Sequence, residues 1–363
     1  MSKSSIFEAM RILFYPLALV YAIITSLRNL FFNVGLLRER SFPLPIIGVG
    51  NLSTGGTGKS PHVIYLAALL KDDKKVAVLS RGYGRRSKGY REVNVADSVG
   101  LTGDEPLQYK TLYPELTVAV CEKRVDGIEM LMKEKHPEVI LLDDSFQHRY
   151  VKPGLNLMLT DYNDLFYNDH ILPAGNLREV RRGVKRADAV IVSKTNPLPN
   201  LQEFEKIDRK IRRYGVQEVF FSYMRYREYV ESGNGERMAL SELKNKKVMV
   251  VAGIANPQPL IDFLQMHSDK VEIEKYGDHH AFTAGDLTAL TKKFDMFAAA
   301  RKEGAVIITT RKDYMRLNSA ELAHLLKRLP VVILDIEICF HTFGQQKFDH
   351  YILNYVKKNS GIR

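Results

Sequence analysis

The sequence is poor in cysteine, lacks tryptophan and contains no repeats or low-complexity tracts. Its two cysteines, Cys121 and Cys339, lie far apart in apolar runs typical of β-strands. Such isolated thiols exclude a disulfide framework and a cysteine-based zinc site, so we expect both to be buried. The missing tryptophan excludes nothing.

Acidic residues are scarce relative to basic ones. The 363-residue chain has 53 Lys and Arg against 42 Asp and Glu, which gives a net charge of +11. This excess favours an anionic partner, such as a phosphorylated metabolite, an anionic membrane or nucleic acid. No nucleic-acid-binding module is recognisable, and the basic residues gather in turns near a predicted phosphate site. We therefore expect no nucleic-acid partner.

Long hydrophobic runs are missing except near the N-terminus. The 16 residues from Ile12 to Leu27 carry no charge. As a helix they would span about 24 Å, less than the roughly 30 Å hydrocarbon core of a bilayer, and Pro16 is expected to interrupt or kink them. No signal-peptide cleavage site is evident. We predict that residues 1–40 form a helix seated in one leaflet; the alternatives are a helix buried against the soluble core and a full membrane span.

A glycine-rich segment dominates the functional interpretation. It lies between a strand-like run, residues 45–50, and a helical run, residues 62–70, which is the context of a P-loop. In such a loop, backbone N–H groups converge on phosphate oxygens, Lys59 reaches the outer phosphates and the Ser60 hydroxyl binds Mg²⁺. Ser53 replaces the usual first glycine, and the alternative is a flexible surface loop. The predicted ATP-binding residues are Ser53, Thr54, Gly55, Gly56, Thr57, Gly58, Lys59 and Ser60.

Carboxylates follow the P-loop at two places. An apolar strand, residues 139–142, runs into Asp143 and Asp144, which is the Walker B pattern that holds the Mg²⁺ shell. Asp104 and Glu105 stand at the start of a predicted helix. There they either cap the helix or form a carboxylate pair beside the phosphates, one binding metal and the other acting as a base.

Strand-like and helical runs alternate up to about residue 220. This pattern predicts an α/β fold with a doubly wound parallel sheet of the P-loop NTPase type, followed by a second, smaller α/β domain. The stretches 221–229 and 331–337 are expected to be strands, and a C-terminal helix, residues 348–358, is expected to return to the first domain. The predicted limits are 1–40 for the membrane-associated helix, 41–220 for the P-loop kinase core, 221–338 for the second domain and 339–363 for the C-terminal segment.

Several motifs resemble those of the tetraacyldisaccharide 4′-kinase family of lipid A assembly, and they occur in the same order as in that family. No single motif is decisive, but the ordered set covers nearly the whole chain. Two positions depart from the family pattern: Ser145 stands where Gly is usual, and Arg311 where Glu is common. The matching segments are 50–51 with 55–61, 80–85, 103–106, 143–148, 172–179, 252–257, 278–282 and 310–313.

The resemblance implies a kinase that transfers the γ-phosphoryl group of ATP to the 4′-hydroxyl of tetraacyldisaccharide 1-phosphate, giving lipid IVA. It also implies a site at the cytoplasmic face of the inner membrane, with no obligatory protein partner. A leaflet-seated helix, basic loops and a phosphate-binding loop suit such a lipid phosphate. Phosphoryl transfer mainly requires positioning and charge neutralisation.

We assign roles to the site residues as hypotheses. Asp104 accepts the proton of the sugar hydroxyl, and His279 from the second domain pairs with it. Arg178 clamps the transferring phosphate oxygens, and Arg124 is a weaker candidate for this task. His279 and His280 lack further ligands at zinc spacing. The expected Mg²⁺ ligands are Ser60, Glu105, Asp143 and Asp144.

A different class of protein remains an alternative. The Gly-Gly-Thr-Gly-Lys-Ser segment is also similar to that of membrane-associated partitioning ATPases, which act as nucleotide-switched scaffolds. Those proteins carry an extra Lys near the start of the loop, where this chain has Thr54. They also tend to place their amphipathic helix at the C-terminus.

Overall fold

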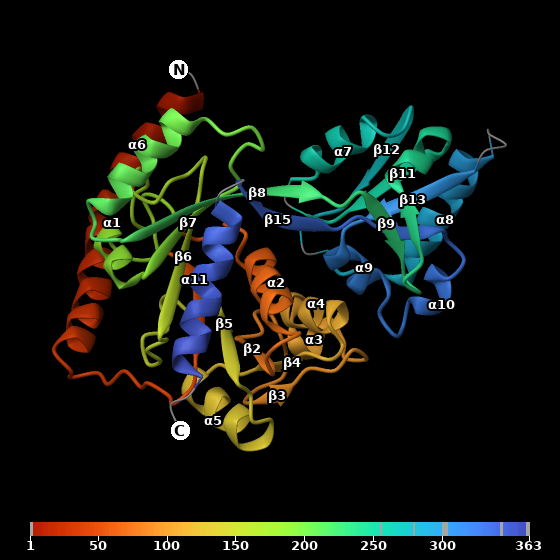
Figure 1. The fold of residues 1–363 in the computed structure, drawn as a ribbon. Helices are drawn as coiled ribbons and strands as arrows, with labels where there is room; N and C mark the ends of the chain where they lie inside the picture. The colour runs from red at the N-terminus through yellow and green to blue at the C-terminus, as the bar shows by residue number, and fades with distance from the viewer. Residues whose placement is uncertain (1–2, 255, 279, 300–303, 342–343, 361–363) are drawn as a thin grey trace.

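The computed structural model describes residues 3–254, 256–278, 280–299, 304–341 and 344–360. Two sheets lie side by side, and the chain crosses between them twice, from β8 to β9 and from β14 to β15 (Figure 1). The nine-stranded sheet has the order β15-β8-β7-β6-β1-β5-β2-β4-β3. Its strands are β1 (Ile46–Asn51), β2 (Val76–Ser80), β3 (Arg91–Glu92), β4 (Thr117–Val120), β5 (Val139–Asp143), β6 (Leu155–Asp161), β7 (Ala189–Ser193), β8 (Glu218–Tyr226) and β15 (Ile336–Phe340).

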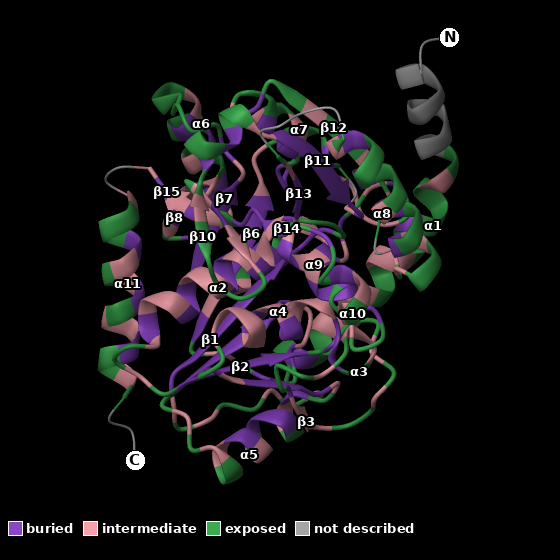
Figure 2. Cartoon of the chain, turned by 90° about the vertical axis from the view of Figure 1, so that its right-hand side faces the viewer, coloured by how far each residue is buried: buried purple, intermediate pink, exposed green. Residues whose placement is uncertain are grey.

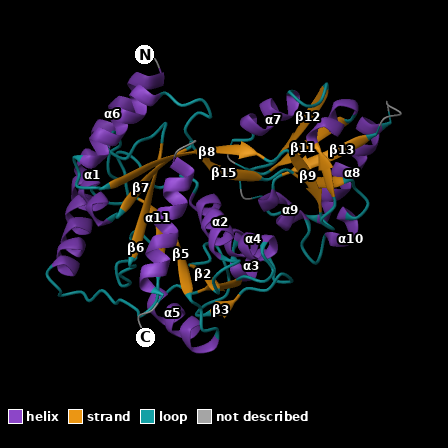
Figure 3. Cartoon of the chain, viewed as in Figure 1, coloured by secondary structure: helices purple, strands orange, loops and turns teal. Residues whose placement is uncertain are grey.

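The nine-stranded sheet is parallel from β8 to β4 and has an antiparallel strand at each edge. Its strands are continuous apolar runs because helices cover both faces (Figure 3). On one face pack α2 (Lys59–Leu70), α4 (Asp104–Leu112) and α11 (Gly344–Asn359). On the other pack α5 (Arg124–Glu134) and α6 (Leu201–Arg212). The predicted doubly wound α/β fold is confirmed.

The second sheet is smaller and has the order β10-β9-β14-β13-β11-β12. Strands β14, β13, β11 and β12 are parallel to one another, whereas β9 and β10 are antiparallel to their neighbours. Its strands are β9 (Tyr229–Ser232), β10 (Arg237–Ala239), β11 (Lys247–Ala252), β12 (Lys270–Lys275), β13 (Ala305–Thr309) and β14 (Val331–Ile333). Its helices are α7 (Gln258–Gln265), α8 (Ala284–Ala298), α9 (Arg311–Leu317) and α10 (Ala323–Leu326).

Two stretches predicted as single strands are each divided between the sheets. Residues 221–229 contribute to β8 and β9, and residues 331–337 contribute to β14 and β15. The second break lies at Leu334 and Asp335, where the Asp335 carboxylate accepts hydrogen bonds from Arg311. The chain limits predicted at 220 and 338 both fall inside strands of the nine-stranded sheet, and the division into domains stays a prediction.

The C-terminal helix α11 returns to the first sheet, as the sequence predicted. Phe348, Ile352 and Val356 are buried in the same core cluster as strands β1 and β5. The Tyr355 hydroxyl donates to the Ile46 carbonyl over 3.1 Å and accepts from the Ile46 N–H at 3.2 Å. The last helix therefore supports the strand that leads into the P-loop.

The N-terminal helix α1 (Lys3–Asn33) is continuous, so Pro16 does not interrupt it. By length and composition Leu13–Asn33 is able to cross a membrane, because 21 helical residues span about 31 Å. Only 6% of its most apolar window is buried. From Leu13 on, where burial is described, the helix lies along the outside of the molecule and most of its residues are exposed (Figure 2). The alternative of a helix buried in the soluble core is therefore wrong.

His62 connects the helix after the P-loop to β8, the strand that leads toward the second sheet. Its Nδ1 lies 2.7 Å from the Gly58 carbonyl and its Nε2 lies 3.0 Å from the Ser222 hydroxyl. Because a carbonyl only accepts, Nδ1 carries the proton and Nε2 accepts from Ser222. Burial lowers the pKa of His62 to about 4, although the bond to Gly58 opposes this shift. The ring is therefore neutral in the folded chain.

We predict that this neutral histidine makes stability depend on pH. The unfolded chain binds the proton more readily, so the free energy of unfolding should fall as pH drops from about 6.5 toward 4. Between pH 7 and pH 5 the loss should be about 2 kcal/mol. In His62→Gln this component should be missing from chemical denaturation curves, whereas the exposed His350→Gln should retain it. Equal pH dependence in both variants would refute the assignment.

Candidate active site

The P-loop lies between β1 and α2 and is braced by its surroundings. The Thr54 N–H donates to the Asn176 carbonyl over 2.7 Å, and the Ser193 hydroxyl donates to the Thr57 carbonyl over 2.8 Å. Gly58 has φ +83°, and a Cβ there would lie 2.6 Å from the Met224 Cε, so glycine is required at this position. These contacts fix the backbone of the loop between β1 and α2, and within the loop the Thr57 N–H donates to the Gly55 carbonyl over 3.0 Å.

Asn51, at the end of β1, is a site residue that the sequence analysis missed. Its side-chain amide donates to the Thr57 hydroxyl over 3.0 Å. Its amide oxygen accepts from Lys59 at 3.3 Å and also from Arg178. The sequence offered a signal, because Asn51 belongs to one of the matching motifs and is a polar residue that ends a buried strand. Its role depends on contacts that only the folded chain shows.

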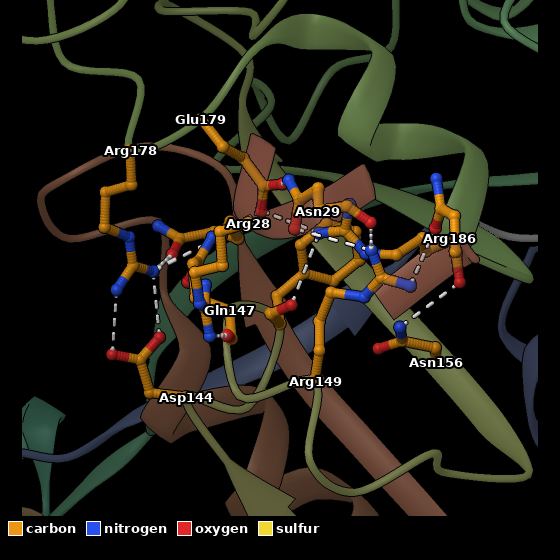
Figure 4. Close-up of polar contacts among 12 residues, drawn as sticks. Arg28, Asn29, Asp144, Gln147, Arg149, Asn156, Arg178, Glu179 and Arg186 are labelled. Carbon is orange, nitrogen blue, oxygen red and sulfur yellow. Dashed lines mark hydrogen bonds and ion pairs between the residues drawn. The ribbon is translucent and has the colours of Figure 1, made fainter. Parts of the chain in front are cut away.

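Asp144 binds the two predicted phosphate-binding cations. Arg178 holds its carboxylate with both terminal nitrogens, at 2.9 and 3.2 Å, and the Lys59 Nζ lies 3.6 Å away (Figure 4). Burial by itself would raise the pKa of Asp144, but the Arg178 hydrogen bonds and the nearby Lys59 lower it to about 2. The carboxylate is therefore ionised, and it keeps both cations at the mouth of the P-loop.

Asp143, directly before Asp144, is more completely buried. The Ser80 hydroxyl donates to its Oδ2 over 3.0 Å, while its buried Oδ1 has no hydrogen-bond partner among the residues that the structure describes. Burial and the neighbouring charges of Glu105 and Asp144 raise the pKa of Asp143. An orphaned carboxylate oxygen beside two further carboxylates fits the approach of a divalent cation, which would relieve this repulsion.

Glu105 and Ser60 complete the expected metal-binding set. The Ser60 hydroxyl donates to the Glu105 carboxylate over 2.6 Å. In the described part of the chain no group of three or more His, Cys, Asp or Glu side chains is arranged to hold a metal ion. In nucleotide sites Mg²⁺ commonly takes one or two carboxylates and completes its octahedron with phosphate oxygens and waters.

Asp104 is not a helix cap. Gly103 is the N-cap of α4 and Asp104 is its first residue. Arg316 of α9 donates to both oxygens of the Asp104 carboxylate, from Nε at 3.3 Å and also from Nη2. The predicted base therefore faces the second sheet, as the hypothesis of a cross-domain pair requires. The predicted partner His279 lies outside the described residues.

Arg124, the weaker candidate for a phosphate clamp, is buried beneath the site. Its guanidinium donates to the Cys121 carbonyl over 2.7 Å and to the Asp143 carbonyl over 3.1 Å. Burial lowers its pKa to about 10, against the opposing charges of Asp143 and Asp144. This geometry favours a supporting role for Arg124, which holds two strand ends together, over contact with phosphate.

The segment that carries Arg178 is held by the N-terminal helix (Figure 4). The Tyr21 hydroxyl donates to the Arg178 carbonyl over 3.1 Å, and the Asn29 amide donates to Glu179 over 2.8 Å. Glu179 is buried and also accepts from Arg186 at 2.6 Å. The polar face of α1 thus positions the predicted phosphate clamp, while its apolar face is exposed.

Comparison with known proteins identifies the family. The model of the tetraacyldisaccharide-1-P 4′-kinase family matches residues 10–357. The chain is 41% identical to the tetraacyldisaccharide 4′-kinase of Bacteroides thetaiotaomicron, over 95% of this chain and 93% of that protein. It is 39% identical to the tetraacyldisaccharide 4′-kinase of Flavobacterium johnsoniae, over 96% of this chain and 98% of that protein.

A solved structure agrees with this result. The crystal structure of LpxK from Aquifex aeolicus in complex with ATP superimposes with a TM-score of 0.74 at 28% identity, covering 96% of this chain and 99% of that one. The match spans both sheets and the predicted P-loop kinase core. The chain belongs to the tetraacyldisaccharide 4′-kinase family.

Proposed function

We propose that this protein transfers the γ-phosphoryl group of ATP to the 4′-hydroxyl of tetraacyldisaccharide 1-phosphate, which forms lipid IVA. Family membership supports the reaction. The observation that carries it to this chain's own residues is the cluster in which Lys59 and Arg178 share Asp144 at the mouth of the P-loop. Two cations held there before substrate arrives lower the reorganisation needed to bind a transferring phosphoryl group.

Residues on the first sheet and its loops bind ATP, the phosphoryl donor. Lys59 contacts the outer phosphates, and Arg178 binds equatorial phosphate oxygens as a planar fork. Ser60, Glu105, Asp143 and Asp144 are the residues that would hold Mg²⁺. When bound, this ion neutralises phosphate charge and orients the terminal phosphoryl group. The unpartnered Oδ1 of Asp143 supports this set.

The acceptor side uses Asp104. The bond from phosphorus to the bridging oxygen of ADP breaks while a bond forms to the sugar 4′-oxygen, and the hydroxyl proton passes to the Asp104 carboxylate. Arg316 pairs with the Asp104 carboxylate, and an ionised carboxylate is the form that accepts a proton. His279 is retained as the proposed partner of this base.

The lipid substrate suggests where the protein works. Along α1, side chains such as Leu13, Leu17 and Ile24 are more than half exposed, at 75%, 58% and 59%. We propose that this apolar face enters the cytoplasmic leaflet of the inner membrane and brings the site to its substrate. The opposite, polar face of the helix holds the Arg178 segment.

The alternative of a partitioning-type switch ATPase is not favoured. The family match extends over residues 10–357, including the second sheet and most of the N-terminal helix. A scaffold that only binds and hydrolyses ATP would not require an acceptor base such as Asp104.

Asp104→Asn should abolish transfer while leaving the fold intact. The amide cannot take the proton, so we expect the rate to fall by about 10²–10⁴-fold. The assay uses detergent-solubilised protein with γ-labelled ATP, magnesium and tetraacyldisaccharide 1-phosphate, and follows label into lipid. Asp208→Asn, in an exposed ion pair of α6, is the matched control. Full transfer by Asp104→Asn would eliminate this residue as the base.

Lys59→Met should also be inactive, through loss of phosphate binding.

Arg178→Lys should lower kcat by about 10–100-fold, because a lysine keeps the charge but loses the two-pronged contact. Single-turnover transfer at saturating ATP measures the effect. The neighbouring exposed Arg182→Lys should behave as the parent protein. An Arg178→Lys variant with unchanged kcat would show that charge alone is required at this position.

Paired Asp substitutions at Ile23 and Leu27 should reduce binding to vesicles containing anionic phospholipid. Each exposed side chain that enters the leaflet contributes about 1.5–3 kcal/mol, so partitioning should fall by at least 100-fold. Co-sedimentation measures the bound fraction. The matched control places Asp at Leu198 and Leu201, which are exposed but outside α1. Equal losses in both double variants would contradict a membrane role specific to α1.

A further inference from the structure

Helix α9 of the second domain presents two cations to the site on the first sheet. Lys312 and Arg316 are four residues apart and so lie on one face of the helix. They contact the two consecutive carboxylates at the start of α4: Arg316 pairs with Asp104, and Lys312 with Glu105. Lys312 lies in the family-matching segment 310–313, and local sequence alone assigns it no role.

The position of Lys312 is unlike that of a surface ion pair. Its Nζ lies 3.4 Å from the Glu105 Oε1, the same oxygen that accepts the Ser60 hydroxyl at 2.6 Å. The Glu105 carboxylate therefore bridges Lys312 and the Ser60 hydroxyl at the start of the P-loop helix. Lys59 and Arg178 approach the same region from the first sheet, through Asp144.

The helix that carries Lys312 is firmly held. Arg311, directly before it, is buried and donates to Asp335 over 2.9 Å and to Glu231 over 3.0 Å. Arg316 also donates to Asp313 over 3.0 Å, and its side chain is 7% exposed. Lys312 is less enclosed, with 31% of its side chain exposed. Its ammonium is thus partly open to solvent on a firmly packed helix.

We infer that Lys312 is a catalytic residue, a cation that the second domain supplies to the phosphoryl group in transfer. The inference rests on the proposed kinase function. Glu105 is one of the residues that would hold Mg²⁺, and with nucleotide bound the Lys312 ammonium would exchange this carboxylate for a phosphate oxygen. Lys312 makes no covalent bond and moves no proton. It offsets charge on the transferring oxygens, where a preformed donor has its largest effect.

Arg316 contributes differently, as a positioning residue. Its bonds to Asp313 and to the Gly253 carbonyl lie within the second domain, and its bonds to Asp104 cross to the first. It fixes the position of α9 relative to α4. The proposed base Asp104 and the Lys312 ammonium then both face the reacting group. Transfer then requires both domains in contact.

The test compares Lys312→Met, Lys312→Arg and Lys312→Ala with Lys293→Met, which removes an exposed ion pair to Glu274 in the same domain. Three quantities are measured: the single-turnover rate of lipid labelling, the Kd of ATP and the midpoint of thermal unfolding. We expect Lys312→Met to lower the rate by about 10²–10³-fold, with the Kd of ATP changed by less than about threefold. Lys312→Arg should recover part of the loss, and added methylammonium should accelerate Lys312→Ala saturably.

The outcomes separate this inference from the proposed function. If the parent protein labels no lipid, the proposed function and this inference both fail. If the parent labels lipid and Lys312→Met does so at the same rate, the inference alone fails. A purely structural tie to Glu105 would make Met and Arg equally defective, with no acceleration by methylammonium, and would also overturn it.

Discussion

The site is organised by the need to keep several carboxylates together at the end of a parallel sheet. Burial, together with the neighbouring charges of Glu105 and Asp144, raises the pKa of Asp143. Because like charges repel, the arrangement requires nearby cations. Lys59 and Arg178 meet this requirement at Asp144, and Lys312 meets it at Glu105. The same cations are then in place for the phosphates of a nucleotide.

These cations come from three separate parts of the chain. Lys59 begins the P-loop helix, Arg178 lies in a segment fastened by the N-terminal helix, and Lys312 lies on α9, which follows β13 of the second sheet. The N-terminal helix thereby has two tasks on its two faces. Its exposed apolar side chains suit a leaflet, and its polar side chains hold the backbone of the phosphate clamp. In the proposed function, one element would therefore serve both membrane seating and phosphoryl transfer.

The connection between the domains also begins at the P-loop. His62 donates to the Gly58 carbonyl and accepts from Ser222 of β8, and the Met224 side chain of the same strand fills the space left by Gly58. The strand that leads to the second domain is thus packed against the phosphate-binding loop itself. A change in the loop would be felt directly by β8, because a close-packed contact transmits displacement.

Much of this protein was determined by local sequence alone. The P-loop, the Walker B strand and the alternating strands and helices follow from spacing and periodicity, and the ordered motifs indicated the family that the comparisons confirmed. Lys59, Arg178, Asp143 and Asp144 were predicted together, and the structure brings them together. Tertiary structure alone decided that α1 is continuous through Pro16, that two expected strands divide between sheets, and that Asn51, Lys312 and Arg316 contact predicted site residues. The physical reason is that a sequence pattern indicates only the local structure that each segment favours. An ion pair such as Asp104 with Arg316 joins residues 212 positions apart, so it forms only once the two sheets have packed.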